Sequence, residues 1–419
     1  MKQYETYKDS GIAWLGKIPR HWLCLRVKDF GKTRSGDGLT LTEQSSDGVY
    51  EVWGGNGFVG YHNSYNENGN SIIIGRVGAL CGNVRLCKFP IFVTDNAMIL
   101  TVNQDISISF LYYSLRARDL NKLNESNAQP LITGTKVLNT FVPIPPHSEQ
   151  VRIVEYLDAK CGDIDNRIVV LEKEQKAYER LKVAVINRAV TEGLDPETPK
   201  RDSGLDWLGM IPEHWEVKRL KECFSMGKGL SITKDDLRET GSSVISYGQI
   251  HAKNNSGVTI KQDFIRYVDE SYCLTNPQAI VPKGGFIFAD TSEDVLGSGN
   301  CIYQDRDEVI LGGYHTVILY PKESNDNKYL AYLFQTDKWR KQIRSNVYGI
   351  KVMSITQTIL GKCSIVLPPY SEQKAIAEYL DTKCAAIDAK IGNIAKRIEA
   401  YKRLKRALIN EVVTGKRAV

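Results

Sequence analysis

The sequence lacks the long apolar runs of a membrane protein. No stretch of its 419 residues approaches the roughly 18 uncharged apolar residues that a membrane-spanning helix needs. The first residues, Met1 to Ser10, are polar and do not contain the apolar core of a signal peptide. Both absences predict a cytoplasmic protein that has no membrane partner.

The sequence also lacks paired-cysteine motifs and nucleotide-binding motifs. The nine cysteines are scattered from Cys24 to Cys384, and none forms a C-x-x-C pair. This spacing argues against a disulfide framework and a cysteine-rich zinc site, so the cysteines are interpreted as small buried residues. Neither G-x-x-x-x-G-K-[S/T] nor H-E-x-x-H occurs, which argues against ATP use and a zinc-protease site.

The charge balance is only mildly basic. The formal net charge is +6 and the isoelectric point is about 8.6, which permits nucleic-acid binding without requiring it. Hydrophobic residues make up 42% and charged residues 25%, as in an ordinary globular protein. The length suggests two to four domains.

The sequence does contain a long internal repeat. D-S-G-I-A-W-L-G-K-I-P-R-H-W at 9–22 returns as D-S-G-L-D-W-L-G-M-I-P-E-H-W at 202–215. A second pair of blocks, 145–168 and 368–391, shares P-P-x-S-E-Q and a following amphipathic run. The segments between the blocks look unlike each other. A repeated frame that carries two dissimilar domains suggests one task performed twice on two different objects.

The dissimilar segments still contain recognisable patterns. Strand-like runs lie at 71–74 and 97–102, and helix patterns at 110–113 and 329–334 are expected in the cores. Near the ends of both segments, the offset of 223 residues pairs Ile132 with Ile355, Thr133 with Thr356, Val137 with Leu360 and Val142 with Ile365 without a gap.

Each second block is predicted to begin a long helix. The Pro-Pro pair ends the preceding strand-like run, and Ser148 or Ser371 is expected to be the N-cap. Each helix has roughly 44 residues and is about 66 Å long at 1.5 Å per residue. His21 and His214, in the repeated tryptophan element, are expected to be structural.

Apolar residues recur every seven positions along both helices, which is typical of a coiled-coil seam. The seam residues are Leu157, Ile164, Leu171, Tyr178 and Val185 in the first helix, and Leu380, Ile387, Ile394, Tyr401 and Leu408 in the second. Two such helices are expected to pair antiparallel and to place one domain at each end. Separate burial of two amphipathic helices is the alternative.

The duplicated D-S-G-x-x-W-L-G-x-I-P-x-H-W, the duplicated P-P-x-S-E-Q before a long helix, and the alternation with dissimilar domains resemble the specificity subunit of type I restriction–modification systems. The resemblance covers essentially the whole chain. It implies an α/β (α+β) fold, in which two globular mixed α/β target-recognition domains are separated by two long helices that form an antiparallel coiled coil, with internal pseudo-two-fold symmetry.

The repeat and the resemblance together divide the chain into six parts. These are an N-terminal frame element (1–22), the first target-recognition domain (23–144), the first long frame helix (145–192), a linker with the repeated tryptophan element (193–215), the second target-recognition domain (216–367) and the second long frame helix (368–419).

The resemblance also implies a function and partners. Each recognition domain would read one half of a bipartite double-stranded DNA sequence, and the helices would set the spacer. Two modification subunits would methylate adenine, and restriction subunits would cleave DNA. S-adenosylmethionine, ATP and Mg are then expected on the partner subunits, and this chain is expected to bind no cofactor or metal.

Motifs for catalysis are weak. Gly55 to Gly60 matches G-x-G-x-x-G, but the following residues do not have a helical pattern, which a donor-binding loop requires. Pro368-Pro369-Tyr370 follows Leu367, where an amino-methyltransferase would have a polar residue. Asp290, Glu293 and Asp294 are interpreted as an acidic loop rather than a nuclease metal site. No catalytic residue is predicted.

The candidate DNA-binding residues lie near glycine-rich loops and carry groups that hydrogen-bond bases or phosphates. In the first domain they are Asn56, Tyr61, His62, Arg76 and Asn96; in the second they are Tyr247, Gln249, His251, Ser292, His315 and Lys351. The alternative is that these residues form structural turns.

Two other functions remain open at this stage. One is a solitary methyltransferase or nuclease fused to its own recognition domains, which purified protein that methylates DNA alone would support. The other is a coiled-coil scaffold that binds no nucleic acid, which the weak basicity allows.

Overall fold

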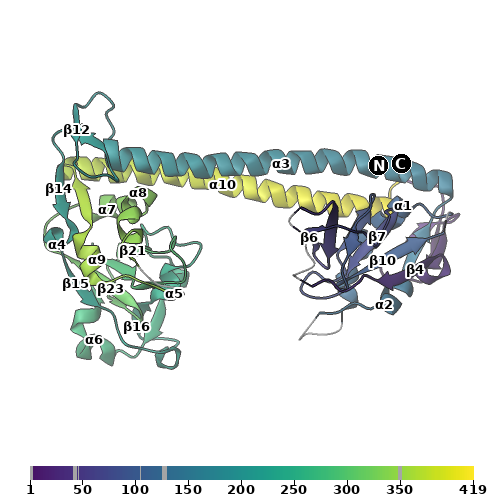
Figure 1. The fold of residues 1–419 in the computed structure, drawn as a ribbon, viewed down its shortest axis with the longest axis horizontal. Coiled ribbons are helices and arrows are strands. Elements are labelled where there is room, and N and C mark those ends of the chain that lie inside the picture. The colour runs from purple at the N-terminus through teal and green to yellow at the C-terminus, as the bar shows by residue number, and fades with distance from the viewer. Residues whose placement is uncertain (1–2, 41–44, 46, 104, 125–129, 348–351) are drawn as a thin grey trace. The chain divides into compact units, whose positions relative to one another are not determined.

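The chain folds into two compact units that each combine segments distant in the sequence. The computed structural model describes residues 3–40, 45, 47–103, 105–124, 130–347 and 352–419. Unit 1 comprises Met1–Lys173 and Ile394–Val419, and unit 2 comprises Glu174–Asn393. Each unit therefore contains one mixed α/β domain and a part of each long helix (Figure 1).

Unit 1 is built on a four-stranded antiparallel sheet in the order β4-β10-β7-β8. Ile72 and Ile74 of β7 pack with the helix α1, whereas Ile73 packs on the opposite face. The continuous apolar run of β7 is thus explained, since both faces of this sheet are buried. The strands are β4 (Gly31–Ser35), β10 (Ala97–Val102), β7 (Ser71–Gly75) and β8 (Val84–Cys87), and α1 is Ile108–Arg118.

A smaller sheet and two pairs of antiparallel strands complete the strands of unit 1. The order of the smaller sheet is β6-β5-β9, with β5 antiparallel to β6 and parallel to β9. Its strands are β6 (Gly57–His62), β5 (Tyr50–Gly54) and β9 (Phe92–Val93). β1 (Tyr7–Asp9) pairs with β2 (Lys17–Pro19), and β3 (Leu23–Arg26) pairs with β11 (Phe141–Ile144), while the short helix α2 covers Gly134–Leu138.

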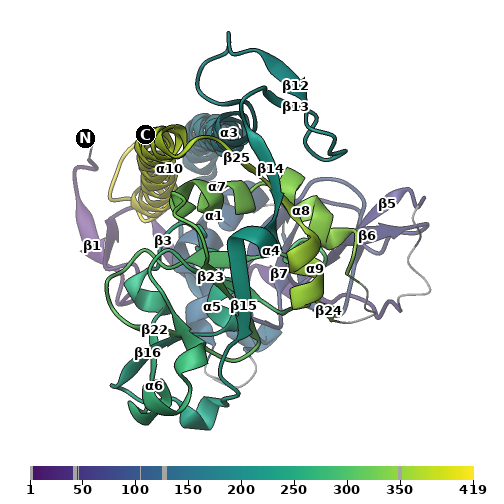
Figure 2. The ribbon, with the colours of Figure 1, turned by 90° about the vertical axis from the view of Figure 1, so that its left-hand side faces the viewer.

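Unit 2 repeats this plan with an antiparallel sheet of order β15-β23-β19-β21. Phe286 and Phe288 of β19 pack on the helix α7, and Ile287 and Ala289 contribute to the core on the other face. Figure 2 faces this unit. The elements are β15 (Phe224–Lys228), β23 (Thr316–Pro321), β19 (Phe286–Ala289), β21 (Cys301–Tyr303) and α7 (Asn327–Phe334).

The second sheet of unit 2 has the order β17-β16-β22-β18, with β16 parallel to β22. Its strands are β17 (Arg266–Val268), β16 (Ser242–Ile245), β22 (Ile310–Gly312) and β18 (Ile280–Val281). The remaining strands pair as β12 (Lys200–Asp202) with β13 (Met210–Pro212), β14 (Glu216–Arg219) with β25 (Ser364–Leu367), and β20 (Thr291–Ser292) with β24 (Met353–Ser354). The helices are α4 (Leu220–Cys223), α5 (Tyr247–Ile250), α6 (Ser271–Thr275), α8 (Asp337–Arg344) and α9 (Gln357–Lys362).

The two dissimilar sequences therefore share one topology. The ungapped pairing at an offset of 223 is confirmed, because Thr133 and Thr356 are the N-caps of α2 and α9. The side chain of each threonine accepts a hydrogen bond from the backbone N–H three residues later. The isoleucine that directly precedes each threonine is buried. The predicted strands at 71–74 and 97–102 and the predicted core helices are also confirmed.

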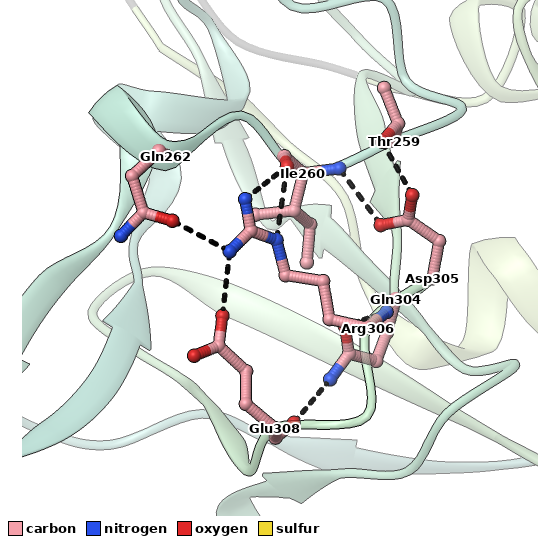
Figure 3. A network of polar contacts seen from close by, with 7 residues as sticks. All are labelled: Thr259, Ile260, Gln262, Gln304, Asp305, Arg306 and Glu308. Atoms are coloured by element: carbon pink, nitrogen blue, oxygen red, sulfur yellow. Dashed lines mark hydrogen bonds and ion pairs between the residues drawn. The ribbon is translucent and has the colours of Figure 1, made fainter.

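The greater length of the second domain lies mainly in the connections around β17. Only residues 55–56 join β5 to β6, whereas residues 246–265 join β16 to β17. Figure 3 shows how polar contacts fix this longer connection. The Arg306 guanidinium donates to the Ile260 carbonyl at 2.9 and 3.1 Å and to the Glu308 carboxylate at 2.9 Å. The Asp305 carboxylate accepts from the Ile260 N–H at 3.0 Å.

Both long helices form as predicted, but each begins two residues earlier than a serine N-cap would place its start. α3 covers His147–Glu192 and α10 covers Tyr370–Val413. Ser148 and Ser371 therefore lie inside the first turn, and the prediction that they are N-caps is wrong. The Pro146 carbonyl already accepts from the N–H groups of Glu149 and Gln150, so the proline before the histidine occupies the capping position.

Within each unit, the parts of α3 and α10 pack against one another in antiparallel order. In unit 1, Lys405 contacts Asp165 at 2.6 Å and Tyr401 contacts Arg167 at 3.5 Å, so partner numbers fall as residue numbers rise. In unit 2, Lys182 contacts Asp388 at 2.7 Å and Tyr178 contacts Lys390 at 3.4 Å. The two sets of contacts are related by the offset of 223, so the helices pair in the same register in both units.

Burial follows the heptad pattern along both helices. Most predicted seam residues are fully buried, and Tyr178, Val185 and Tyr401 are half-buried. In unit 1, Leu157 and Ile164 share a core with Leu408 and the end of α10. In unit 2, Leu380 shares a core with Val190 at the end of α3.

The repeated motifs form the joint between each domain and the helices. In unit 1, the Glu149 carboxylate accepts from the Trp22 indole at 3.1 Å and contacts His21 at 3.0 Å. The buried Gln150 amide accepts from the Ser107 N–H, which precedes α1, and donates to the Pro145 carbonyl, both at 2.9 Å. The expectation that His21 is structural agrees with this contact.

The joint of unit 2 is built from the equivalent residues. Glu372 contacts His214 at 2.7 Å, and the Gln373 side chain accepts from the Asp326 N–H at 2.9 Å and donates to the Pro368 carbonyl at 2.8 Å. The P-P-x-S-E-Q motif thus has a packing explanation, since Glu holds the tryptophan element and Gln holds the start of the domain helix.

Two further observations concern the whole chain. Among the described residues, no helix is both long enough and apolar enough to cross a membrane. All nine cysteines are free, and seven of them are buried, in agreement with their interpretation as small core residues.

Candidate nucleic-acid interface

Three loops of unit 1 meet where the small and large sheets end. They carry Asn56 in the β5–β6 turn, Arg76 directly after β7, and Asn96 directly before β10. Glycines permit this approach, because a Cβ on Gly75 would lie 2.1 Å from the Gly55 carbonyl oxygen. A Cβ on Gly55 would lie 2.8 Å from the Asn96 carbonyl oxygen. The G-G-N-G and I-G-R-V-G sequences are therefore explained by close backbone packing.

The side chains of this loop cluster remain available to a partner. Asn56 and Asn96 are exposed, and Arg76 is half-buried. The Arg76 guanidinium donates to the Ser35 hydroxyl and, at 3.1 Å, to the Asp95 carbonyl. The Asn56 carbonyl accepts from the Arg85 guanidinium at 2.6 Å, and burial lowers the pKa of Arg85. The backbone is thus held rigidly while amide and guanidinium groups face outward.

Tyr61 and His62 do not join this cluster. His62 pairs with Tyr50 at the end of the β5–β6 hairpin that is opposite the Asn56 turn. The His62 ring lies within 3.1 Å of the Ser64 N–H and hydroxyl, so it holds a local turn. Tyr61 is 40% exposed and packs edge-on against Phe58. Sequence proximity to the glycine loop does not place these two residues at the loop cluster.

Unit 2 presents the same three positions with different residues. Tyr247 follows β16, Asp290 follows β19, and His315 precedes β23. The Tyr247 and His315 rings are 5.6 Å apart, and the His315 Nδ1 lies 3.0 Å from the Asp290 carboxylate. Tyr247 and His315 line a cavity of about 640 Å³ together with His251, Ser292 and Glu293. The sequence analysis named Tyr247, His251, Ser292 and His315, and the structure brings them together.

Other candidates in unit 2 have internal partners. The His251 Nε2 lies 2.8 Å from the Thr291 carbonyl, and its Nδ1 lies 3.1 Å from the Asn300 amide, so both ring nitrogens are engaged. The Ser292 hydroxyl donates to the Asp294 carbonyl at 2.7 Å. The Gln249 side chain accepts from the Ser246 N–H at 3.0 Å and so caps α5. Lys351 lies outside the described residues.

The contact of Asp290 and the position of Tyr314 were not predicted from the sequence. Asp290 was grouped with Glu293 and Asp294 in an acidic loop, but its carboxylate pairs with His315. Tyr314 is 42% exposed and its ring lies 4.0 Å from that of His315. In the part of the chain that the structure describes, no group of three or more His, Cys, Asp or Glu side chains is placed to hold a metal ion. Asp290 could have been identified from its position in the sequence, since it directly follows a buried strand, as Arg76 does.

A protein-family model matches a segment in each half of the chain. The model described as the type I restriction modification DNA specificity domain matches residues 19–177 and 212–400. The chain belongs to the type I restriction modification DNA specificity domain family. The two matched segments each carry one of the loop clusters, so the chain contains this specificity domain twice. The predicted family is confirmed.

Curated relatives agree with this family. The MjaVIII specificity subunit of a type I restriction enzyme from Methanocaldococcus jannaschii is 24% identical over 98% of this chain and 97% of its own length. The EcoprrI specificity subunit from Escherichia coli is 28% identical over 44% of this chain and 47% of its own length.

A solved structure supports the fold. It comes from a study of complex assembly and conformational transition of the type I R-M system. Its chain is 17% identical, with a TM-score of 0.68 over 94% of this chain and 98% of that one. The mixed α/β fold with two domain repeats is therefore shared with a member of such a system.

Proposed function

We propose that this chain is the DNA-reading subunit of a type I restriction–modification complex and that it performs no catalysis. Each unit would read one half of a bipartite sequence in double-stranded DNA. The observation that carries the proposal is the pair of loop clusters. One backbone arrangement, built twice on the same repeated joint, presents Asn56, Arg76 and Asn96 in unit 1 but Tyr247, Asp290 and His315 in unit 2. A shared scaffold with different outward groups is suited to reading two different sequences.

In this proposal the paired helices form an antiparallel coiled coil that sets the spacer between the half-sites. The heptad burial and the antiparallel contacts within each unit support it. A helix rises about 1.5 Å per residue, so the helix length would fix how many base pairs are left unread.

The helices would also dock two modification subunits. Leu181 in unit 2 and Leu404 in unit 1 occupy equivalent repeat positions, and they are 47% and 54% exposed. Val169 and Val170 are exposed as well. Single exposed apolar side chains are common on protein surfaces, but the repetition of an exposed leucine, as Leu181 and Leu404, favours two equivalent partners. S-adenosylmethionine would bind to the modification subunits, and ATP and Mg to the restriction subunits.

A solitary methyltransferase receives no support from the local geometry. Residues Gly55 to Gly60 form a tight turn and the strand β6, whereas a donor-binding loop leads from a strand into a helix. The alternative function, a scaffold that binds no DNA, does not explain why the two loop clusters carry different residues.

Exchange of one domain tests the proposal. Residues 23–144 are replaced with the corresponding domain of another family member, and the methylated adenines are mapped in cells that also express the modification subunit. We expect one half-site to change while the other half-site and the gap stay constant. The reciprocal exchange of residues 216–367 is the matched control, and it should change only the other half-site. A change in both half-sites after a single exchange would contradict the two-reader proposal.

A further inference from the structure

Arg76 and Asp290 occupy the same backbone position in the two units. The Arg76 N–H donates to the Asn96 carbonyl at 2.9 Å, and the Arg76 carbonyl accepts from the Ile132 N–H at 2.9 Å. The Asp290 N–H donates to the His315 carbonyl at 3.1 Å, and the Asp290 carbonyl accepts from the Ile355 N–H at 2.7 Å. Ile132 and Ile355 are themselves paired by the repeat, so the main chain makes equivalent hydrogen bonds at the two positions.

The side chains at this position have opposite charge. The Arg76 guanidinium contacts only neutral oxygens among the described residues, those of Ser35 and Asp95, and keeps donors free. The Asp290 carboxylate uses one oxygen for His315 and is 34% exposed. His315 has a left-handed backbone with φ of +53°, a conformation that is uncommon for residues other than glycine. The Asp290 carboxylate thus contacts the His315 ring, and the His315 ring lines the cavity.

The opposite charges indicate what this position faces. An arginine can contact either a phosphate or a guanine. A carboxylate at the same position would be repelled by phosphate, but it can accept a hydrogen bond from the exocyclic amino group of a base. If both units present the loop cluster to DNA in the same way, the position faces base edges in the major groove rather than the phosphate backbone.

We propose that Arg76 and Asp290 are the specificity-determining pair of this chain. Arg76 reads a guanine in one half-site through the acceptors O6 and N7. Asp290, oriented by His315, reads an amino-bearing base, cytosine or adenine, at the corresponding place in the other half-site. The inference rests on the proposed function, in which each unit reads one half of the target.

The test uses the full chain expressed with its modification subunit, and the readout is the sequence around each methylated adenine. Arg76→Gln should move one position of one half-site from guanine toward adenine, because glutamine pairs with adenine. Asp290→Asn should relax one position of the other half-site. A base contact of this kind discriminates roughly 5- to 150-fold, so the wrong bases should rise by that factor.

Controls separate reading from folding. Glu239→Gln alters an exposed carboxylate of unit 2 that lies outside the cavity and has no partner among the described residues, and it should leave the fold and both half-sites unchanged. Thermal unfolding of the Asp290→Asn protein shows whether loss of the His315 contact unfolds unit 2. If that variant unfolds, the Arg76→Gln result alone decides the inference.

Three results are distinguishable. A wild-type chain that directs methylation to a split motif, with each variant changing one position of a different half-site, supports the inference. A split motif that stays unchanged in folded variants, with uniformly weaker methylation and a smaller dependence on salt, would assign both residues to phosphate contact or structure and overturn it. Absence of a split motif for the wild-type chain would instead overturn the proposed function.

Discussion

Replacement of Gln150 by leucine tests the joint that attaches the first domain to the helices. The Gln150 side chain is 1% exposed, and its amide accepts from the Ser107 N–H and donates to the Pro145 carbonyl, both at 2.9 Å. Leucine has a similar volume but satisfies neither group. Each buried polar group left without a partner costs about 1–3 kcal/mol, so the loss should be about 2–6 kcal/mol.

Urea unfolding of the purified chain measures this loss. With a slope of about 2 kcal/mol per molar urea, the transition that reports unit 1 should shift down by roughly 1–3 M. Hydrogen exchange at the start of α1 should accelerate, because the Ser107 N–H loses its acceptor. Gln175→Leu is the matched control, since Gln175 makes one contact to Glu179 on an exposed helix surface. It should change stability by less than about 0.5 kcal/mol.

The equivalent residue in unit 2 provides an internal replicate. Gln373 accepts from the Asp326 N–H and donates to the Pro368 carbonyl. Gln373→Leu should therefore destabilise unit 2 by a similar amount. If Gln150→Leu were as stable as Gln175→Leu, the structural explanation of the P-P-x-S-E-Q motif would be refuted.

Three further predictions follow from the helices and the cores. The charge reversals Asp165→Lys and Lys405→Asp should each lower the free energy of unfolding by about 0.2–1 kcal/mol, and the double variant should recover most of this loss. If the double-mutant cycle showed no recovery, the antiparallel pairing in unit 1 would be contradicted. Insertion of four residues, about one helical turn, after Lys173 should lengthen the unread gap or abolish methylation; mapping that shows full methylation with the original gap would argue against the spacer role. Iodoacetamide should label the half-buried Cys273 well before Cys301, because burial raises the pKa of the Cys301 thiol to about 12 and thiolate is the reactive form; equal labelling rates by mass spectrometry would show that the core of unit 2 opens readily.

The elements with strong periodicity could be predicted from the sequence. The heptads of α3 and α10 extend over many turns, and long repeats leave little ambiguity about secondary structure. The start of α3 was off by two residues, because the Pro146 carbonyl already accepts the first helical hydrogen bonds and Ser148 therefore lies inside the first turn. Helix ends depend on single hydrogen bonds, which residue preferences alone do not determine.

The loop clusters were only partly predictable. Asn56 and Arg76 stood out because they lie in glycine-rich loops, and tight backbone packing does bring them together with Asn96. Tyr61 and His62 were grouped with them through closeness in sequence, yet a strand carries His62 away to the opposite end of its hairpin. The whole set of DNA-binding candidates remains a prediction until base contacts are measured.

The correspondence between Arg76 and Asp290 could not be found by aligning the two halves of the sequence. The surrounding segments differ in sequence and length, so alignment gives no reason to pair an arginine with an aspartate. The pairing becomes evident from hydrogen bonds that the main chain makes in both units, and those depend on the sheet topology. The proposed specificity-determining pair thus lies where the two halves of the sequence are least similar.

The most direct measurement is base-resolution mapping of methylated adenine in DNA from cells that express this chain with its modification subunit. Two readers held by one pair of helices should give a single split motif, with two specific halves and an unread gap of constant length. An assembled complex that methylates a contiguous motif, or that methylates no DNA, would contradict the account.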